Sequence, residues 1–214
     1  MKILLNLLWR LLVLNCGLFI FAVGISCSVA SNLGLPAWDV LHQGISFHTP
    51  LTLGQVIQVS GVVILLIAFW LGAKPGIGSF FNIFFIGFWI DIILKSEILS
   101  TFSALGLWAQ GLLVLACLLL AGLGAGLYTR PALGIGPRDS LMVALVRKTG
   151  YRVALIRTIM EISAILAGWL LGGVVGIGTL VIAFGIGPAV ELSYHLFGVQ
   201  VHHVRKISPI VENI

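Results

Sequence analysis

Six long apolar stretches, separated by connections that are richer in polar residues, organise the chain. Each stretch is close to the roughly 20 residues that a helix needs to cross about 30 Å of hydrocarbon. The pattern therefore predicts an all-α polytopic membrane protein with six transmembrane helices, at 11–30, 53–72, 77–96, 105–127, 153–172 and 177–196. The composition agrees, because 59% of the residues are hydrophobic and only 9% are charged, whereas about 25% are charged in soluble domains.

The sequence also resembles itself after a shift of one hundred positions. Glycines and their neighbours coincide best: Gly24 with Gly124, Leu33-Gly34 with Leu133-Gly134, and Gly76-Ile77-Gly78-Ser79 with Gly176-Ile177-Gly178-Thr179. We therefore expect a single membrane domain over 1–214, with a first repeat at 10–98, a second repeat at 110–198 and a cytoplasmic tail at 199–214. Each repeat holds three spans, which is an odd number. The two should thus form inverted three-helix repeats, as in many secondary transporters.

Basic residues are distributed unevenly over the connections. In a six-span topology one side of the membrane receives Lys2, Arg10, Lys74, Arg130, Arg138, Arg147, Lys148, Arg152, Arg205 and Lys206. Lys95 falls on the other side. Because cytoplasmic loops are enriched in Lys and Arg, the N-terminus and the C-terminus are both predicted to be cytoplasmic. Orientation thus accounts for the net charge of +5, and we expect no nucleic-acid partner.

The connections after the first and the fourth span are long enough to hold more than a turn. Each carries an LGxxxxD motif, which ends at Asp39 in one repeat and at Asp139 in the other, and each continues into a short apolar helix, at 40–46 and 140–146. Such a helix is too short to cross, so it is either interfacial or re-entrant, and a re-entrant helix must be buried in protein or face water. If both are re-entrant, their N-termini direct positive dipole ends at one central cavity.

Several motifs match one family in particular. The matching segments are Leu35-Pro36-Ala37-Trp38-Asp39-Val40-Leu41-His42-Gln43-Gly44, Pro75-Gly76-Ile77-Gly78-Ser79, Leu133-Gly134-Ile135-Gly136-Pro137-Arg138-Asp139-Ser140-Leu141-Met142, Arg157 with Glu161, and Gly172-Gly173-Val174-Val175-Gly176-Ile177-Gly178-Thr179. Over roughly residues 10–195 the chain resembles the YczE-like family of bacterial integral membrane proteins, which is related to the YitT group. The resemblance implies a multi-pass protein of the bacterial cytoplasmic (inner) membrane that is similar to transporters in outline, and it names no substrate.

Glu161 is the first candidate for a substrate or ion site. It lies about eight residues into the fifth predicted span, some 12 Å deep at 1.5 Å per residue. An ionisable residue within a membrane is costly and suggests function. The structural alternative is an ion pair with Arg157, one helical turn earlier, that locks this span against its neighbours. Both Arg157 and Glu161 are therefore retained as candidates.

Asp39 and Asp139 are the next candidates, with Trp38 and Arg138 immediately before them. An aromatic ring from one repeat and a guanidinium group from the other would suit a flat anionic or zwitterionic ligand. Each aspartate has a structural alternative as the N-cap of its short helix, and Arg138 has one as a cytoplasmic anchor. Near the ends of the third and sixth spans, the pairs Asp91 with Lys95 and Glu191 with His195 are interpreted as interfacial anchors.

No grouping of residues supports catalysis or a cofactor. A nucleophile with a base and an orienting acid cannot be assembled, so we expect no enzyme and assign no catalytic residue. His202 and His203 lack further ligands at suitable spacing, and no metal or other cofactor is expected. We favour a secondary transporter of an unknown small molecule, with a proton on Glu161 or Asp39 as candidate coupling ion. The alternative is a non-transporting accessory or assembly subunit. The expected partners are the lipid bilayer, that substrate and, as an open alternative, further copies of the chain.

Overall fold

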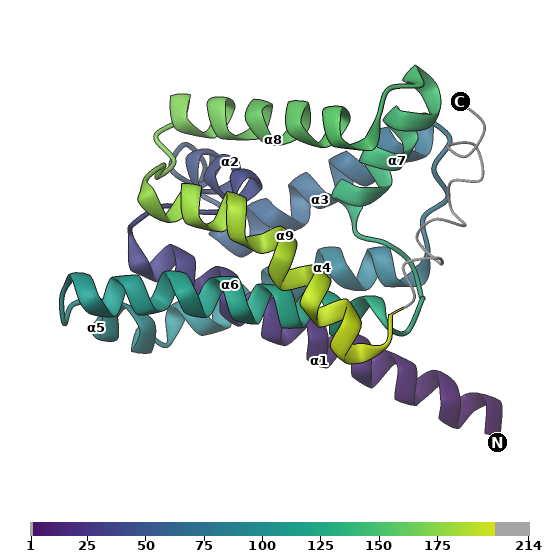
Figure 1. Cartoon of the computed structure of the whole chain (residues 1–214), viewed down its shortest axis with the longest axis horizontal. Helices are drawn as coiled ribbons and strands as arrows, with labels where there is room; N and C mark the ends of the chain where they lie inside the picture. The colour runs from purple at the N-terminus through teal and green to yellow at the C-terminus, as the bar shows by residue number, and fades with distance from the viewer. Residues whose placement is uncertain (1, 200–214) are drawn as a thin grey trace.

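A computed structural model describes residues 2–199, which form nine helices and no strand. Their bounds are α1 Lys2–Ser31, α2 Ala37–Ser46, α3 Leu53–Trp70, α4 Ile77–Lys95, α5 Ile98–Ser103, α6 Leu107–Thr129, α7 Pro137–Thr149, α8 Val153–Leu170 and α9 Ile177–Phe197. Six of these, α1, α3, α4, α6, α8 and α9, are long and apolar enough to cross a membrane (Figure 1). The prediction of an all-α membrane protein with six spans is therefore confirmed.

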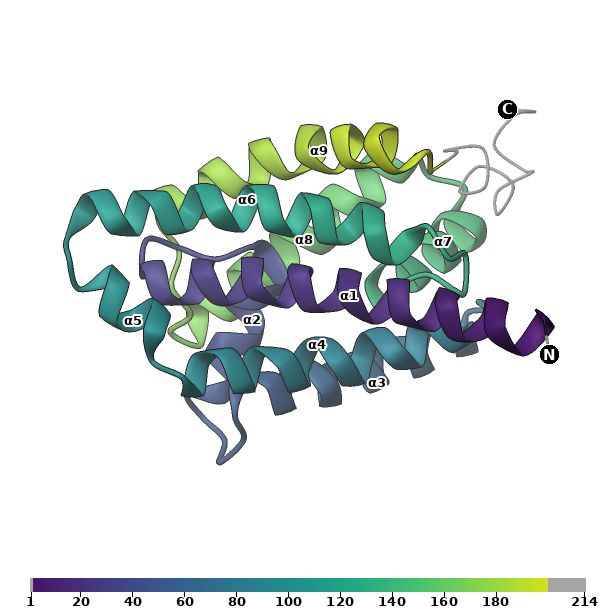
Figure 2. The same ribbon diagram turned by 90° about the horizontal axis from the view of Figure 1, so that it is seen from below.

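The shorter helices refine the predicted pattern. Those expected at 40–46 and 140–146 correspond to α2 and α7, each of which begins three residues earlier than expected. The connection after α4 contains a helix that the apolar pattern did not indicate, α5. Figures 1 and 2 show α2 and α5 towards one end of the bundle, and α7 with the N-terminus of α1 towards the other. The tail expected at 199–214 lies outside the described residues, apart from Val199.

The centre of the bundle is the packing of α1 against α6, which lie side by side (Figure 2). A side chain at Gly24 would collide with the backbone of Ala121, and one at Gly124 would collide with that of Phe21. Position 21 of α1 thus meets position 124 of α6, and position 24 meets position 121, so the two helices run in opposite directions and are antiparallel. Small residues permit this close approach, which in lipid is stabilised by dispersion and interhelical contacts.

We refer to residues 10–98 as the first half and to residues 110–198 as the second half. Most helix contacts of one half have a counterpart in the other half. Helix α1 packs on α4 as α6 packs on α9, and α2 packs on α8 as α7 packs on α3. The backbone repeats the scheme: the Gly78 amide donates to the Leu133 carbonyl at 2.9 Å, and the Gly178 amide donates to the Leu33 carbonyl at 2.8 Å. These bonds hold the segment before each short helix against the first turn of α4 or α9.

One contact has no equal in the other half. Helix α3 packs along α4, whereas α8 makes no comparable contact with α9. The carbonyl of Gly54 leaves no room for a side chain at Gly87, but a side chain at the matching Gly187 would meet nothing within 4 Å. The second half is therefore open between two helices where the first half is closed.

Candidate ligand-binding cavity between the two halves

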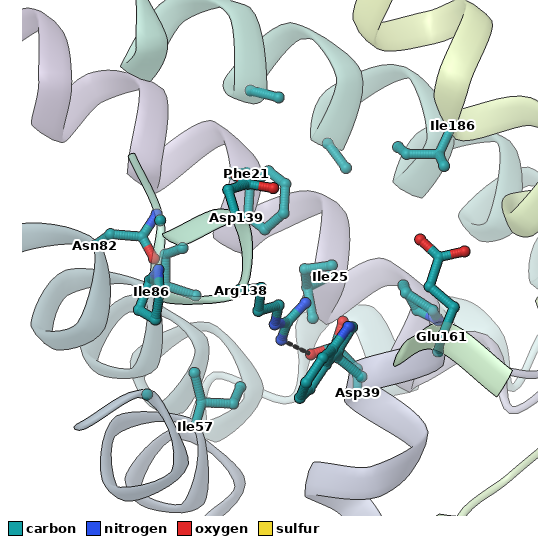
Figure 3. Close-up of a pocket in the computed structure, with 18 of the residues that line it drawn as sticks. Phe21, Ile25, Asp39, Ile57, Asn82, Ile86, Arg138, Asp139, Glu161 and Ile186 are labelled. Atoms are coloured by element: carbon teal, nitrogen blue, oxygen red, sulfur yellow. Dashed lines mark hydrogen bonds and ion pairs between the residues drawn. The ribbon is translucent and has the colours of Figure 1, made fainter. Parts of the chain in front are cut away.

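A cavity of about 280 Å³ lies where the two halves meet. This is near the lower end of the roughly 300–1,000 Å³ typical of small-molecule sites. Most of its lining positions occur in pairs one hundred apart, including Phe21 with Ala121, Ile25 with Ala125, Asp39 with Asp139, Ile57 with Arg157, Gly61 with Glu161 and Ile86 with Ile186 (Figure 3). The six candidate site residues all line it: Trp38, Asp39, Arg138, Asp139, Arg157 and Glu161.

The two short helices α2 and α7 both begin at this cavity. Gly34 and Gly134, with φ of +126° and +142°, provide the turns that precede them, in a conformation that residues other than glycine rarely adopt. The N-cap residues are Pro36 and Gly136. Asp39 and Asp139 sit three residues further on, so the interpretation of the aspartates as N-caps is wrong for both. Their carboxyl groups are free for other partners.

Asp39 forms a buried cluster with Arg138 and His42. Its Oδ1 atom lies 3.2 Å from Arg138 Nη2, the contact dashed in Figure 3, and 3.2 Å from His42 Nδ1. His42 Nδ1 also lies 3.4 Å from Arg138 Nη2, so it donates to Asp39 when protonated and accepts from Arg138 when it is not. Arg138 is thus an ion-pair partner across the two halves, and its interpretation as a cytoplasmic anchor stays an alternative. His42 was not expected from the sequence, although its position one turn after Asp39 could have indicated it.

Burial governs the electrostatics of this cluster. It would raise the pKa of Asp39, which is 2% exposed, but the Arg138 charge and the His42 ring outweigh it and hold that pKa below its usual value. Burial, aided by Arg138, lowers the pKa of His42, so the ring is neutral at pH 7. Among the described residues, Asp39 Oδ2 and His42 Nε2 are buried and have no hydrogen-bond partner. Such atoms cost free energy unless water or a ligand reaches them.

Arg138 also covers the ring of Trp38, with its guanidinium carbon 5.3 Å from the ring centroid. The two residues occupy the same position in the two halves, so this cation–π contact lies where the halves meet. Arg138 therefore has three partners, all from the first half: Trp38, Asp39 and His42.

Asp139 differs from its counterpart in having no such partner. The residue as a whole is exposed and lines the cavity, while protein atoms crowd around its carboxyl group. No donor among the described residues forms a hydrogen bond or an ion pair with it. Burial raises the pKa of Asp139, and the charges of Arg157 and Arg138 offset only part of this rise. Asp139 therefore holds a proton more readily than Asp39, whose pKa is lowered.

Asp139→Asn should make the protein more resistant to heat near neutral pH. A carboxyl group whose pKa is raised by folding binds more protons in the folded state, so it lowers stability as the pH rises above about 4. Asparagine removes this cost. Thermal unfolding in detergent should give a higher melting temperature for the variant at about pH 8 and no difference near about pH 4. A lower melting temperature at the higher pH would mean that the wild-type carboxylate has donors that stabilise it.

Arg157 and Glu161 form an ion pair within α8, with Nε donating to Oε1 at 3.0 Å. Their side chains are 57% and 38% exposed. The pair joins two residues of one helix, so it does not lock α8 against a neighbouring helix. Glu161 instead faces the cavity, as Figure 3 shows.

Asp91 does not line the cavity. Asp91, interpreted as an interfacial anchor, accepts hydrogen bonds from Thr52 Oγ1 at 2.5 Å and from the Gly54 amide at 2.9 Å, so it ties α4 to the N-terminus of α3. Over residues 2–199 no three His, Cys, Asp or Glu side chains are grouped to hold a metal ion. His202 and His203 lie outside the described residues.

Residues 8–195 match the model of a family of unknown function, DUF6198. The chain belongs to this family. It is 35% identical over 180 residues to the uncharacterized membrane protein YczE of Bacillus subtilis (strain 168), covering 83% of this chain and 81% of that protein. An uncharacterized protein of Haemophilus influenzae (strain ATCC 51907 / DSM 11121 / KW20 / Rd) is 36% identical over 179 residues, covering 84% and 80%. The uncharacterized protein YyaS of Bacillus subtilis (strain 168) is 29% identical over 171 residues, covering 77% and 82%. The expected YczE-like membership is thus confirmed. No solved structure matches the chain.

Proposed function

We propose that the protein is a secondary transporter of a small molecule and that its substrate binds in the cavity between the halves. The observation that carries the proposal is the composition of that cavity: equivalent positions of two halves contribute charged side chains to one space among the spanning helices. Charged groups inside a membrane protein typically mark substrate or ion pathways. The proposal involves no catalytic step.

Inverted repeats would give such a transporter its mechanism. Helices α1 and α6 occupy equivalent positions of the halves and are antiparallel, which supports opposite orientations of the two halves. In inverted-repeat transporters the two halves exchange conformations, and the site between them then opens to one side of the membrane at a time.

The unequal contacts of the two halves fit one state of this cycle. In the first half, the Asp91 carboxylate and a hydrogen bond from Gln58 Nε2 to the Phe84 carbonyl at 2.9 Å hold α3 against α4. In the second half, Glu191 is exposed and forms no hydrogen bond with another described residue. The α3–α4 contact is thus a closed gate and the α8–α9 gap is an open one. In the other state α8 would close on α9 while α3 leaves α4.

The open gate faces the cytoplasm if the termini are cytoplasmic. The cavity extends past its paired positions along the second half, to Tyr128, Val190 and Tyr194. Tyr128 and Tyr194 lie near the C-terminal ends of α6 and α9. With six spans and the positive-inside distribution of charge, both ends are on the cytoplasmic side of the bacterial inner membrane. The structure then corresponds to an inward-open state.

Cysteine labelling should establish this orientation. Single cysteines at Phe47 and Ser100 should react with an impermeant maleimide in intact cells, and one at Lys148 should react only after permeabilisation. All three positions are exposed, and the first two lie in connections that the predicted topology places outside. Ser103 in the same connection is buried and unsuitable. The background should have Cys16, Cys27 and Cys117 replaced by Ala. Labelling at Lys148 in intact cells would reverse the topology.

The coupling ion is proposed to be a proton carried by Asp139. Of the residues favoured from the sequence, Glu161 is paired with Arg157, and Asp39 is held ionised by Arg138. Asp139 is free of such a partner and faces the cavity, so its protonation can depend on whether the site is occupied.

Comparison of metabolite uptake and efflux tests the transporter against an accessory subunit. Cells that produce the protein, cells without it, and cells that produce the Asp39→Asn, Arg138→Gln double variant at equal membrane levels should be compared. A transporter changes the distribution of at least one small metabolite, and the double variant abolishes this change. An accessory subunit predicts no difference between cells with the wild type and cells with the variant.

A further inference from the structure

The charges of the cavity leave one carboxylate uncompensated. Its lining includes three acidic residues, Asp39, Asp139 and Glu161, and two arginines, Arg138 and Arg157. Each arginine is already within 3.2 Å of an acidic partner, so that Asp39 and Glu161 are neutralised. His42, the remaining titratable group of the Asp39 cluster, is neutral at pH 7. The charge that a ligand can neutralise is therefore that of Asp139.

Of the aromatic rings that line the cavity, one is covered by a cation and the others are not. Trp38 is covered by Arg138. The cavity is also lined by Phe21, Tyr128 and Tyr194, which no cation of the described residues covers, and the rings of Phe21 and Tyr128 meet edge to face at 5.9 Å. Aromatic rings attract ammonium groups through their quadrupole, most strongly where water is excluded. A free carboxylate in a cavity with uncovered rings is thus suited to an organic cation.

We propose, on the basis of the transporter function above, that the substrate is a small organic monocation: an amine or quaternary ammonium compound whose charged group binds the Asp139 carboxylate. Its apolar body would contact the uncovered rings and the isoleucines that line the rest of the cavity, which include Ile57, Ile64, Ile86, Ile182 and Ile186. A cavity of about 280 Å³ restricts the ligand to a small molecule.

An anion fits the same site poorly. It would lie near Asp139 and Glu161, and it would have to displace a carboxylate from an arginine to gain a partner of its own. The N-terminus of α7 contributes about half a positive charge near Asp139, which cancels only part of the full negative charge of the carboxylate. An anionic or zwitterionic ligand, which Trp38 and Arg138 suggested in the sequence, is disfavoured for this reason.

Cation and proton would then compete for one carboxyl group. Four charged or titratable residues interact electrostatically with Asp139: Arg138 on α7, Arg157 on α8, Tyr128 on α6 and Tyr194 on α9. When the cation binds, the Asp139 carboxyl group releases its proton to water, and when the cation leaves, the carboxylate takes up a proton again. One monocation is exchanged for one proton, so that the net charge of the site is unchanged.

Calorimetry with benzyltrimethylammonium tests the inference, because this probe is permanently charged and any proton released on binding must come from the protein. Binding to the purified protein should be measured at about pH 7 in buffers of different ionisation enthalpy, with benzoate as the anionic comparison. The proteins are the wild type, Asp139→Asn, Asp139→Glu, and Glu97→Gln as a matched control outside the cavity.

Binding of the cation with release of up to one proton is expected for the wild type and for the control. Asp139→Asn should weaken binding at least about tenfold and release no proton, while Asp139→Glu should retain proton release. Tighter binding of benzoate, or unchanged cation affinity in Asp139→Asn, overturns the inference. Failure of the transporter proposal would look different: Asp139 would bind the cation, but the α8–α9 gate would never close in the cross-linking experiment described in the Discussion.

Discussion

Arg138→Gln is expected to destabilise the folded protein by roughly 3 kcal/mol, because the substitution leaves Asp39 buried without a counter-charge. Loss of one partner of a buried ion pair typically costs about 3–5 kcal/mol. Since Arg138 is 33% exposed and Asp39 only 2%, we expect the lower end of this range. Equilibrium unfolding in detergent measures the effect.

Two further variants make this result specific to the ion pair. The double variant Asp39→Asn, Arg138→Gln should recover most of the lost stability, because neither partner is then left as an isolated charge. Arg157→Gln removes the exposed arginine of the other pair and should cost less than about 1 kcal/mol. Equal losses for Arg138→Gln and Arg157→Gln would contradict the assignment of a buried pair.

The pH dependence of Arg138→Gln has a predictable sign. In the wild type, Arg138 helps to lower the pKa of Asp39, and a lowered pKa stabilises the folded state above about pH 4 and ceases to do so as the pH falls. Without Arg138, burial makes the ionised form of Asp39 unfavourable. The variant should therefore lose stability as the pH rises above about 4, and the cost of the substitution should grow towards neutral pH.

Ala154→Trp is expected to trap the protein with its α8–α9 gate open. Ala154 is exposed, whereas a side chain at its counterpart Gly54 would collide with Gly87 and Asp91 in the closed gate. An indole at Ala154 is thus tolerated in the structure as it stands but prevents α8 from approaching α9 as closely as α3 approaches α4. Gly54→Trp should instead destabilise this state, because α3 and α4 are already in contact.

Two pairs of cysteines report on the two gates without a known substrate. In the closed gate, a Cβ atom at Gly61 would lie 3.6 Å from that of Ile83, within the roughly 3.5–4.5 Å that a disulfide needs. Gly61→Cys with Ile83→Cys should therefore cross-link under oxidation in the state described here. The counterpart pair, Glu161→Cys with Ala183→Cys, should cross-link only when α8 closes on α9.

Ala154→Trp should suppress the second cross-link at least about tenfold and leave the first intact. Ala167→Trp is the matched control, because its counterpart Ile67 is 47% exposed and the position faces away from a gate; this variant should change neither cross-link. If the pair at Glu161 and Ala183 never cross-links in the wild type, the two halves do not exchange conformations and the transport mechanism fails.

The sequence predicted most of the charged residues of the cavity but not which of them pair with each other. The repeated motif selected Asp39, Asp139 and the neighbouring Arg138, and the rarity of ionisable residues inside spans selected Glu161. The same residue types and spacings were compatible with N-caps, anchors and interhelical locks. The structure separates these interpretations: Pro36 and Gly136 are the N-caps, and Arg138 pairs with Asp39, which is 99 residues away in the sequence. The spacing of residues along the chain carries no information on such a distant pair.

By itself, the sequence determined the six spans, the repeat and the presence of a short helix after the Gly and Pro residues that follow the first and the fourth span. These features are local, since span length follows from bilayer thickness, helix starts follow from Gly and Pro, and the repeat is a comparison of the chain with itself. The tertiary structure decided which carboxylate is paired, which is free, and that α3 packs on α4 while α8 stands apart from α9. Asp39 and Asp139 have nearly the same local sequence, and they differ because the position before them is Trp in one half and Arg in the other. Arg138, where the halves meet, neutralises Asp39 and leaves Asp139 free.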